Sequence, residues 1–395
     1  MRTTEEYFNS YRQVQKGSFR ILGNENKEIE EFRTVEIRQQ PLFRQYSTLI
    51  CVERANRPVN FNHSSNLYTK GHIQDVVSKM LQSNMDGINL EKAVENELLK
   101  IDQSEEKKKR DKCPFCYPNL EKVTPNPKKM HNSGLTIEDS EFKLAKMPES
   151  KVISVPNLYP FTVPHWVTIF AKHKPDLQEL NFQDIFNYIE SGYEIAKEIK
   201  FIEGVDGMWD IINWGPEAAA SQPHPHAQRG GIATMMITEM DREIEKCTAA
   251  KKYLMDDPFE HYMNRIRQSA LFGFENEHIL IHAPFAPKFP HSIDIICKRK
   301  AGNILDLNEH ERKVIAHSML GVFHLLYNRC GVRDLNVVTH QTRLNSKNES
   351  DYHLHWHFMP RNLNKLGGVE INLNNFVVSV FPEATAKEIK THYKV

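Results

Sequence analysis

Two stretches of this chain follow the same pattern, YPFTVPHWVTIFAKH (159–173) and PFAPKFPHSIDIICKRK (284–300). Each contains Pro-His followed by a run rich in β-branched residues, which is typical of a strand. A Leu-Asn pair follows each run, with its asparagine at Asn181 or Asn308 and an acidic residue three positions later. This is the capping-box pattern that begins a helix. The sequence therefore predicts the order strand then helix twice.

The similarity continues beyond the predicted helices. Each helix leads to a β-type run, DIINWG (210–215) or DLNVVTH (334–340), and then to a histidine cluster, HPHAQ (224–228) or HLHWH (353–357). Pro164 and Pro290 lie 126 residues apart along the chain, Asn181 and Asn308 127, and His224 and His355 131. An ordered set at a nearly constant offset indicates an internal repeat. We therefore expect a duplicated α+β unit, and two unrelated α+β domains are the alternative.

Composition excludes several classes of protein. The chain has 395 residues, which suggests two domains or one duplicated domain. Lys and Arg number 51, as do Asp and Glu, so no global charge favours nucleic acid or an anionic membrane. No stretch approaches the roughly 20 apolar residues of a membrane span, and the first residues do not resemble a secretion signal. Six cysteines do not suggest a disulfide scaffold, so we expect a cytoplasmic protein with reduced thiols.

The chain divides into four segments by pattern. Residues 1–59 read as the N-terminal part of the first repeat. Residues 60–112 read as a helical and charged insert, and its SEEKKKRDK run is typical of a solvated linker. Residues 113–260 and 261–395 are expected to form the N-terminal and C-terminal repeats.

Histidines alternate in both clusters. If each cluster is extended, His224, His226 and Gln228 point to one face, because residues two apart share a side of a strand. His353, His355 and His357 do the same in the second cluster. A metal site, a nucleophile, a polar loop and histidines satisfied within a core are all possible explanations. The last two explain two matching clusters poorly.

The glutamine of the first cluster favours group transfer over hydrolysis. An imidazole can attack phosphorus and form a covalent nucleotidyl intermediate. The amide of Gln228 can bind a phosphate oxygen without titrating near neutral pH. A third histidine at this place could protonate a poor leaving group, whereas a sugar phosphate needs less help.

Cys113 and Cys116 have the spacing of two zinc thiolates. Structural zinc requires two more ligands, for which His173 and His224 are candidates. A redox-active cysteine pair is the alternative, but no thioredoxin-like pattern surrounds it.

Together these motifs resemble the galactose-1-phosphate uridylyltransferase family of the histidine-triad superfamily. The resemblance covers roughly residues 40 to 380, apart from the insert. It implies a duplicated histidine-triad-like unit with two antiparallel sheets and flanking helices, and an active site where two subunits of a homodimer meet. The motifs that carry it are STLICVERANRP (47–58), CPFC (113–116), VTIFAKH (167–173), NWGPEAAASQPHPHAQ (213–228), ENEHILIHAPFAPKFPH (275–291), VVTHQ (337–341) and LHWHFMP (354–360).

The resemblance also implies roles for single residues. His226 matches the nucleophile that attacks the α-phosphate of a nucleotide sugar, assisted by Gln228. Substrate-binding positions of the family match Arg54, Arg57, Asn213 and Ser221.

Two metal sites are implied as well. Zinc would be bound by Cys113, Cys116, His173 and His224. A second metal, zinc or iron, would be bound by Glu243, His340, His355 and His357, with Glu239 as the alternative carboxylate.

Two departures bear on substrate. Ala219 and Ala220 stand where the family usually has glycine and often cysteine before the serine. The segment 362–386 lacks the Lys-Phe and Tyr-Glu pairs that galactose enzymes commonly use for the hexose. It is more similar to the Gly-Phe-Glu version of divergent relatives, some of which are nucleotide-sugar phosphorylases. Glu370 is the candidate for contact with a sugar hydroxyl.

The resemblance therefore implies a nucleotidyltransferase of galactose or wider carbohydrate metabolism. It would exchange NMP between a nucleotide sugar and a hexose 1-phosphate, with UDP-glucose and hexose 1-phosphate as the expected pair. Three alternatives remain: a nucleotide-sugar phosphorylase of the ADP-glucose type, a dinucleoside polyphosphate hydrolase, and a non-enzymatic, zinc-stabilised binding module.

Overall fold

The computed structural model describes most of the residues that follow residue 163. It describes the backbone of 12–22, 28–39, 47–50 and 153–156, and side chains as well over 164–170, 176–347, 351–361 and 367–393, with a few isolated positions elsewhere. The chain forms two compact units, residues 1–55 with 124–395 in one and residues 56–123 in the other. Of the predicted binding residues, Arg54, Arg57 and His173 lie outside the described residues.

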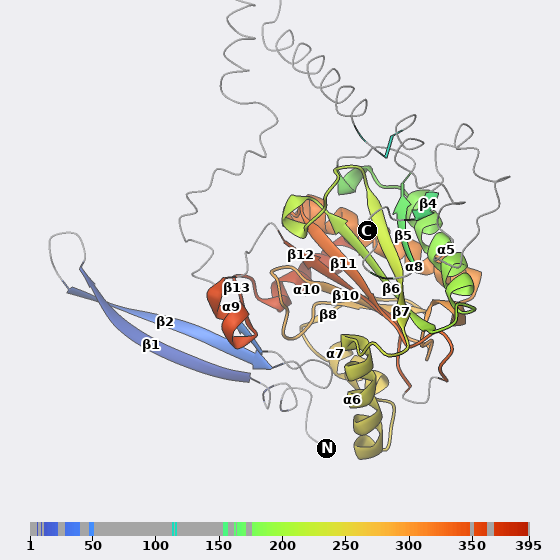
Figure 1. Ribbon diagram of the computed structural model, residues 1–395. Coiled ribbons are helices and arrows are strands. Elements are labelled where there is room, and N and C mark those ends of the chain that lie inside the picture. Colours follow the sequence, from blue (N-terminus) through green and yellow to red (C-terminus); the bar gives the residue numbers. More distant parts are fainter. Residues whose placement is uncertain are drawn as a thin grey trace, which may run out of the picture. The chain divides into compact units, whose positions relative to one another are not determined.

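A nine-stranded sheet forms the centre of the larger unit (Figure 1). All neighbouring strands in it run antiparallel. In spatial order they are β4 (Ile153–Pro156), β5 (His165–Ile169), β7 (His226–Ala233), β6 (Val205–Trp214), β11 (Leu335–His340), β12 (His355–Pro360), β10 (Ile293–Cys297), β9 (Ile279–His282) and β8 (Phe272–Glu275).

The two halves of this sheet mirror each other. The order β5-β7-β6 is followed by β11-β12-β10, so strands that correspond in the sequence pattern lie at matching distances from the centre. At the centre β6 pairs with β11, with Asn213 opposite Asn336. The α+β class with antiparallel strands and flanking helices is confirmed. The expectation of a separate sheet for each repeat is not confirmed, because the strands of both halves belong to one hydrogen-bonded sheet.

The helices begin where the sequence predicts. The side chain of Asn181 accepts a hydrogen bond from Asp184 N at the start of α5 (Phe182–Ile199), and Asn308 accepts one from Glu311 N at the start of α8 (Glu309–Cys330). Both capping boxes are complete. Helix α8 ends at Cys330, and the capping residue Gly331 has a φ of 68°, the left-handed conformation favoured after a helix end.

The two faces of the sheet have different surroundings. One face packs into a large apolar core with α5 and α8, which includes Ile212 of β6, Val337 of β11 and Phe358 of β12. Because side chains alternate along a strand, the histidines of β7 and β12 point to the opposite face. On that face, α7 (Pro258–Arg267) packs against Leu280 and Ile296 in a second cluster.

Among the described residues, the remaining elements are α6 (Glu239–Leu254), α9 (Gly368–Leu373), α10 (Pro382–His392), three short 3-10 helices and a four-stranded sheet. In the part of the chain described, no helix combines the length and apolar character needed to cross a membrane. The 3-10 helices are η4 (Leu177–Glu179), η5 (Pro216–Ala218) and η6 (Ile304–Asp306), and the small sheet has the order β1 (Arg12–Leu22), β2 (Glu28–Gln39), β3 (Ser47–Ile50) and β13 (Asn375–Val378).

Candidate active site and metal centre

His226 begins β7 with its ring held in one orientation. Its Nδ1 donates a hydrogen bond to the carbonyl of His224 at 2.8 Å, and the side chain is buried. A neutral imidazole protonated on Nδ1 carries its lone pair on Nε2. The backbone before it is tied to the neighbouring strand, because Phe170 N donates to Pro225 O at 3.0 Å. This arrangement suits a nucleophile whose attacking atom is Nε2.

Gln228 lies on the same face, two residues along β7. Its Oε1 accepts a hydrogen bond from His165 Nε2 at 3.1 Å. Burial lowers the pKa of His165, and the hydrogen bond to Gln228 partly offsets this, so the ring is neutral at neutral pH. Sequence reasoning did not select His165 as a site residue, although its Pro-His motif was the first sign of the repeat.

Asn213 is the penultimate residue of the neighbouring strand β6. The side-chain oxygen of Asn213, Oδ1, accepts a hydrogen bond from Asn336 Nδ2 at 2.7 Å. Asn336 Nδ2 also donates to Ala218 O at 2.9 Å. The loop that follows includes Ala219 with φ of 62°, a left-handed conformation for which glycine is normally preferred. Ser221, at its end, is exposed. Ala219, which stands in the part of the loop where the family usually has glycine, therefore adopts a backbone conformation that disfavours alanine.

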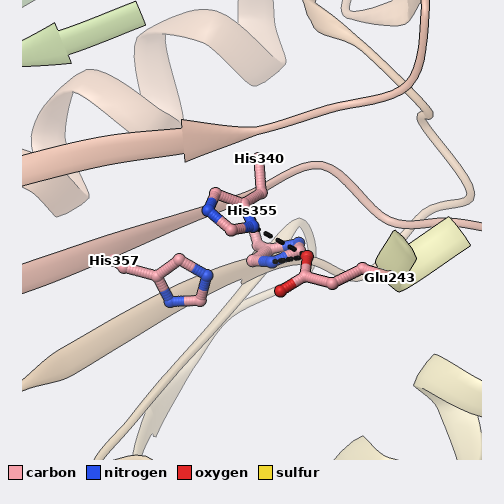
Figure 2. A group of neighbouring side chains, drawn as sticks. All are labelled: Glu243, His340, His355 and His357. Carbon is pink, nitrogen blue, oxygen red and sulfur yellow. Dashed lines mark hydrogen bonds and ion pairs between the residues drawn. The ribbon is translucent and has the colours of Figure 1, made fainter. Parts of the chain in front are cut away.

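Four side chains converge on the other half of the sheet (Figure 2). One ligand atom from each of Glu243, His340, His355 and His357 lies within 4.8 Å of the others. His340 Nδ1 donates to Glu243 Oε2 at 2.7 Å, and His355 Nε2 lies 3.8 Å from the same oxygen. Glu239, the alternative carboxylate, is half exposed beside Arg242 and is not in this group.

Neighbouring groups orient the ligand atoms. His355 Nδ1 donates to His353 O and His357 Nδ1 donates to Asp294 Oδ1, both at 2.7 Å, so each ring turns its Nε2 toward the group. Tyr352 Oη donates to Glu243 Oε2 at 2.8 Å. Such hydrogen bonds commonly orient metal-binding histidines.

The donor set fits a transition metal. Burial, above all, lowers the pKa of His355 to about 4, which leaves a neutral imidazole at neutral pH. Three imidazoles and one carboxylate suit ions such as zinc or iron. These residues could therefore hold a metal, which would tie the end of β11 to β12 and α6.

Helix α6, which carries Glu243, is attached to the sheet by Arg343. This guanidinium donates to both carboxylate oxygens of Asp241, at 2.9 and 2.6 Å, and to Asp206 at 2.8 Å. Thr238 and Asp241 also form the capping box that begins the helix. The first turn of α6 is thereby set, two residues before Glu243.

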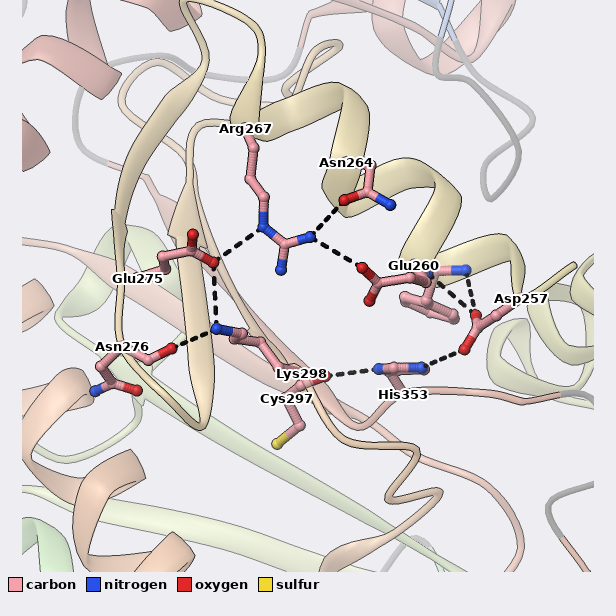
Figure 3. Close-up of polar contacts among 10 residues, drawn as sticks. Asp257, Glu260, Asn264, Arg267, Glu275, Asn276, Cys297, Lys298 and His353 are labelled. Carbon is pink, nitrogen blue, oxygen red and sulfur yellow. Dashed lines mark hydrogen bonds and ion pairs between the residues drawn. The ribbon is translucent and has the colours of Figure 1, made fainter.

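A polar network braces the segment before His355 (Figure 3). His353 Nδ1 donates to Cys297 O at 2.7 Å and its Nε2 to Asp257 Oδ2 at 3.0 Å. Burial alone would raise the pKa of Asp257, but the hydrogen bonds and charge of its partners, chiefly His353, lower it below the usual value. The other oxygen of Asp257 caps α7 by accepting from Phe259 N and Glu260 N. His353, the first histidine of HLHWH, is thus a link to α7 and not part of the four-residue group.

The predicted zinc site remains a prediction. Cys116 N donates to Cys113 O at 3.2 Å within the unit 56–123. His224 belongs to the other unit, where its Nε2 donates to Phe170 O at 2.6 Å.

Glu370, predicted to contact a sugar, lies in α9 and is buried. Its Oε2 accepts from Gly367 N at 2.9 Å. In this structure the carboxylate therefore caps its own helix.

The metal centre yields a first prediction. Replacement of Asp294 by alanine removes the acceptor that orients His357, so we expect metal affinity to fall by about 10- to 100-fold. Competition with a chromophoric chelator measures this. Glu239→Ala, which removes an exposed acid of α6, serves as the control and should bind metal as the wild type does. Equal affinities of the Asp294→Ala and wild-type proteins would contradict the assignment.

Comparison with known proteins agrees with this architecture. The galactose-1-phosphate uridylyltransferase of Thermotoga maritima is 23% identical over 235 residues, which are 57% of this chain and 72% of that protein. The resemblance to the galactose-1-phosphate uridylyltransferase family is confirmed. In sequence and fold, the chain is similar to nucleotidyltransferases of this family. No family model matches the chain.

Two solved structures have the same fold. An ADP-glucose phosphorylase from Arabidopsis thaliana, with bound ADP-glucose, superposes with a TM-score of 0.65 and 17% identity, over 90% of this chain and 98% of its own. A GalT-like protein from the same plant superposes with a TM-score of 0.59 and 18% identity, over 70% and 91%.

Proposed function

We propose that this protein transfers a nucleotidyl group between a nucleotide sugar and a phosphate acceptor through a covalent intermediate on His226. The observation that carries the proposal is the hydrogen bond from His226 Nδ1 to His224 O, which leaves Nε2 as the attacking atom beside Gln228. Sequence similarity to a uridylyltransferase supports the same chemistry.

The reaction has two displacements. In the first, His226 Nε2 attacks the α-phosphorus, a P–N bond forms, and the P–O bond to the departing sugar 1-phosphate breaks. In the second, an oxygen of the acceptor phosphate attacks the same phosphorus and the P–N bond breaks. Two inversions retain configuration at phosphorus. The phosphate oxygens would be bound by Gln228, Ser221, Asn213, Arg54 and Arg57.

Two metals would stabilise this arrangement. Cys113, Cys116, His173 and His224 would hold zinc, and because His224 O orients His226, that metal would set the position of the nucleophile. Glu243, His340, His355 and His357 would hold a second metal. Neither ion is required to touch the reacting phosphorus.

For substrate, we propose UDP-glucose and a hexose 1-phosphate such as galactose 1-phosphate, used in the cytoplasm by a homodimer. Glu370 would contact the hexose after leaving its capping position.

A nucleotide-sugar phosphorylase of the ADP-glucose type is the second candidate. The Gly-Val-Glu sequence at 368–370 favours it, since the galactose-specific pairs are missing, as does the coverage of the solved phosphorylase. Gln228 disfavours a dinucleoside polyphosphate hydrolase. A binding module without catalysis would not require the orientation of His226.

The test is the intact mass of the protein after incubation, without acceptor, in separate tubes with UDP-glucose, ADP-glucose and GDP-mannose. We expect the mass of one UMP to be added from UDP-glucose. An AMP adduct from ADP-glucose would support the phosphorylase instead. If metal-loaded protein gained no mass from any of the three, the proposed covalent step would be wrong.

A further inference from the structure

His165 occupies a place in the fold that matters for Gln228. Its strand β5 pairs with β7, with His165 opposite Gly230 and Val167 opposite Gln228. His165 and Gln228 therefore project from the same face of the sheet on adjacent strands. His165 is 4% exposed, and its Nε2 lies 3.1 Å from Gln228 Oε1.

The ring of His165 has little freedom to turn. It packs edge-on against Trp209, with 4.9 Å between ring centroids. Trp209 is held in turn, because its Nε1 donates to Thr162 Oγ1 at 3.0 Å. A Cβ at Gly230 would come within 2.3 Å of Thr162 Oγ1 and 2.4 Å of the Trp209 ring, so only glycine allows this packing.

A fixed donor decides which end of an amide faces the substrate. Gln228 has an oxygen that accepts and an amino group that donates, and the two ends exchange when the amide flips. Phosphate oxygens require donors. With Oε1 bonded to His165, the amino group is the end left to face a phosphate.

We propose that His165 is a positioning residue that selects the phosphate-binding orientation of Gln228. The proposal rests on the function proposed above and adds to it a residue on a different strand. A neutral His165 protonated on Nε2 is the state that performs this role, and its burial favours the neutral form.

The internal repeat offers a natural comparison. His291 stands in the corresponding Pro-His pair. At the 131-residue offset that relates His224 to His355, the position that corresponds to Gln228 is Met359, which has no amide to orient. His291 has φ of 60°, and its Nδ1 lies 3.2 Å from Thr385 Oγ1. His165 thus bonds to the amide of Gln228 in its half of the sheet, whereas His291 bonds to the hydroxyl of Thr385 in the other half.

The first measurement is independent of catalysis. Nitrogen-15 spectra of protein labelled at histidine, with the signal identified by comparison with His165→Phe, report which ring nitrogen carries the proton. We expect the proton of His165 on Nε2 at neutral pH. A proton on Nδ1 alone would overturn the proposal, whether or not the protein forms a nucleotidyl adduct.

The second measurement is the single-turnover rate of adduct formation with the nucleotide sugar that labels the wild-type protein. We expect His165→Phe to slow this rate by about 10- to 100-fold, the scale of one lost hydrogen bond to a group that binds charge. His165→Gln, whose amide can still donate, should recover part of the rate. His291→Phe, the same change in the other repeat, should leave the rate within about twofold.

A double variant separates positioning from general damage. If His165 acts through Gln228, His165→Phe combined with Gln228→Ala should be no slower than Gln228→Ala alone, because coupled residues are not additive. Full additivity of the two effects, or a His165→Phe protein as fast as the wild type, would overturn the proposal. A wild-type protein that forms no adduct would refute the proposed function, while the proton position would still decide the role of His165.

Discussion

Replacement of His226 by glycine should abolish formation of the nucleotidyl adduct and reduce turnover by on the order of 10⁶-fold, the scale reported for loss of a catalytic nucleophile. The reason is geometric as well as chemical. The hydrogen bond from His226 Nδ1 to His224 O directs Nε2 away from the backbone, and β7 contains no other histidine that could replace it.

Intact-mass and steady-state assays measure this effect. The His226→Gly protein should first be shown to denature at the same midpoint as the wild type. His278→Gly is the matched control, since this half-buried histidine lies beside β9 near the other edge of the sheet. We expect that variant to form the adduct normally. Turnover of the His226→Gly protein within tenfold of the wild type would refute the assignment of the nucleophile.

Arg229→Met should lower the free energy of unfolding by about 3 to 5 kcal/mol, because it leaves a buried carboxylate without its cation. Arg229 is fully buried on the helix-facing side of β7, with Nε 3.0 Å from Asp210 Oδ2. Its other nitrogens donate to Thr168 Oγ1, Ser191 Oγ and Tyr188 O at 2.7 to 2.9 Å. One side chain thus joins strands β5, β6 and β7 to helix α5.

The loss should depend on pH. Burial raises the pKa of Asp210 above its usual value, and the charge of Arg229 opposes that rise. Without the arginine, the folded state binds a proton at Asp210 more readily than the unfolded state does. Stability contributed by a raised pKa is present at low pH and is lost as pH rises through the folded value. The destabilisation should therefore be larger at pH 8 than at pH 5.

Urea denaturation followed by tryptophan fluorescence tests both statements, since the four tryptophans are Trp166, Trp209, Trp214 and Trp356, all in the nine-stranded sheet. Arg329→Met, which breaks an exposed pair with Glu388, should cost less than about 1 kcal/mol. A loss of less than 1 kcal/mol in Arg229→Met as well would show that the buried pair is not a major support of β7.

Local sequence determined the elements of this protein. Asn181 and Asn308 begin helices because their side chains satisfy the first backbone N–H groups, an interaction that spans only three residues. Alternation every second residue placed His226 and Gln228 on one face of a strand, as it placed His355 and His357 on one face of another. The order of landmarks, repeated at a near-constant offset, indicated the family.

Only the tertiary structure decided which distant segments meet. Pairing of β6 with β11 joined the two repeats in one sheet, although each pattern alone would permit a sheet of its own. His165 reached Gln228 because β5 pairs with β7, and Glu243 reached His340 because Arg343 holds the start of α6. Periodicity and capping depend on neighbours in the chain, whereas strand pairing and buried ion pairs depend on how all the apolar faces are covered together. That is why the clusters of histidine could be predicted from the sequence, while their partners could not.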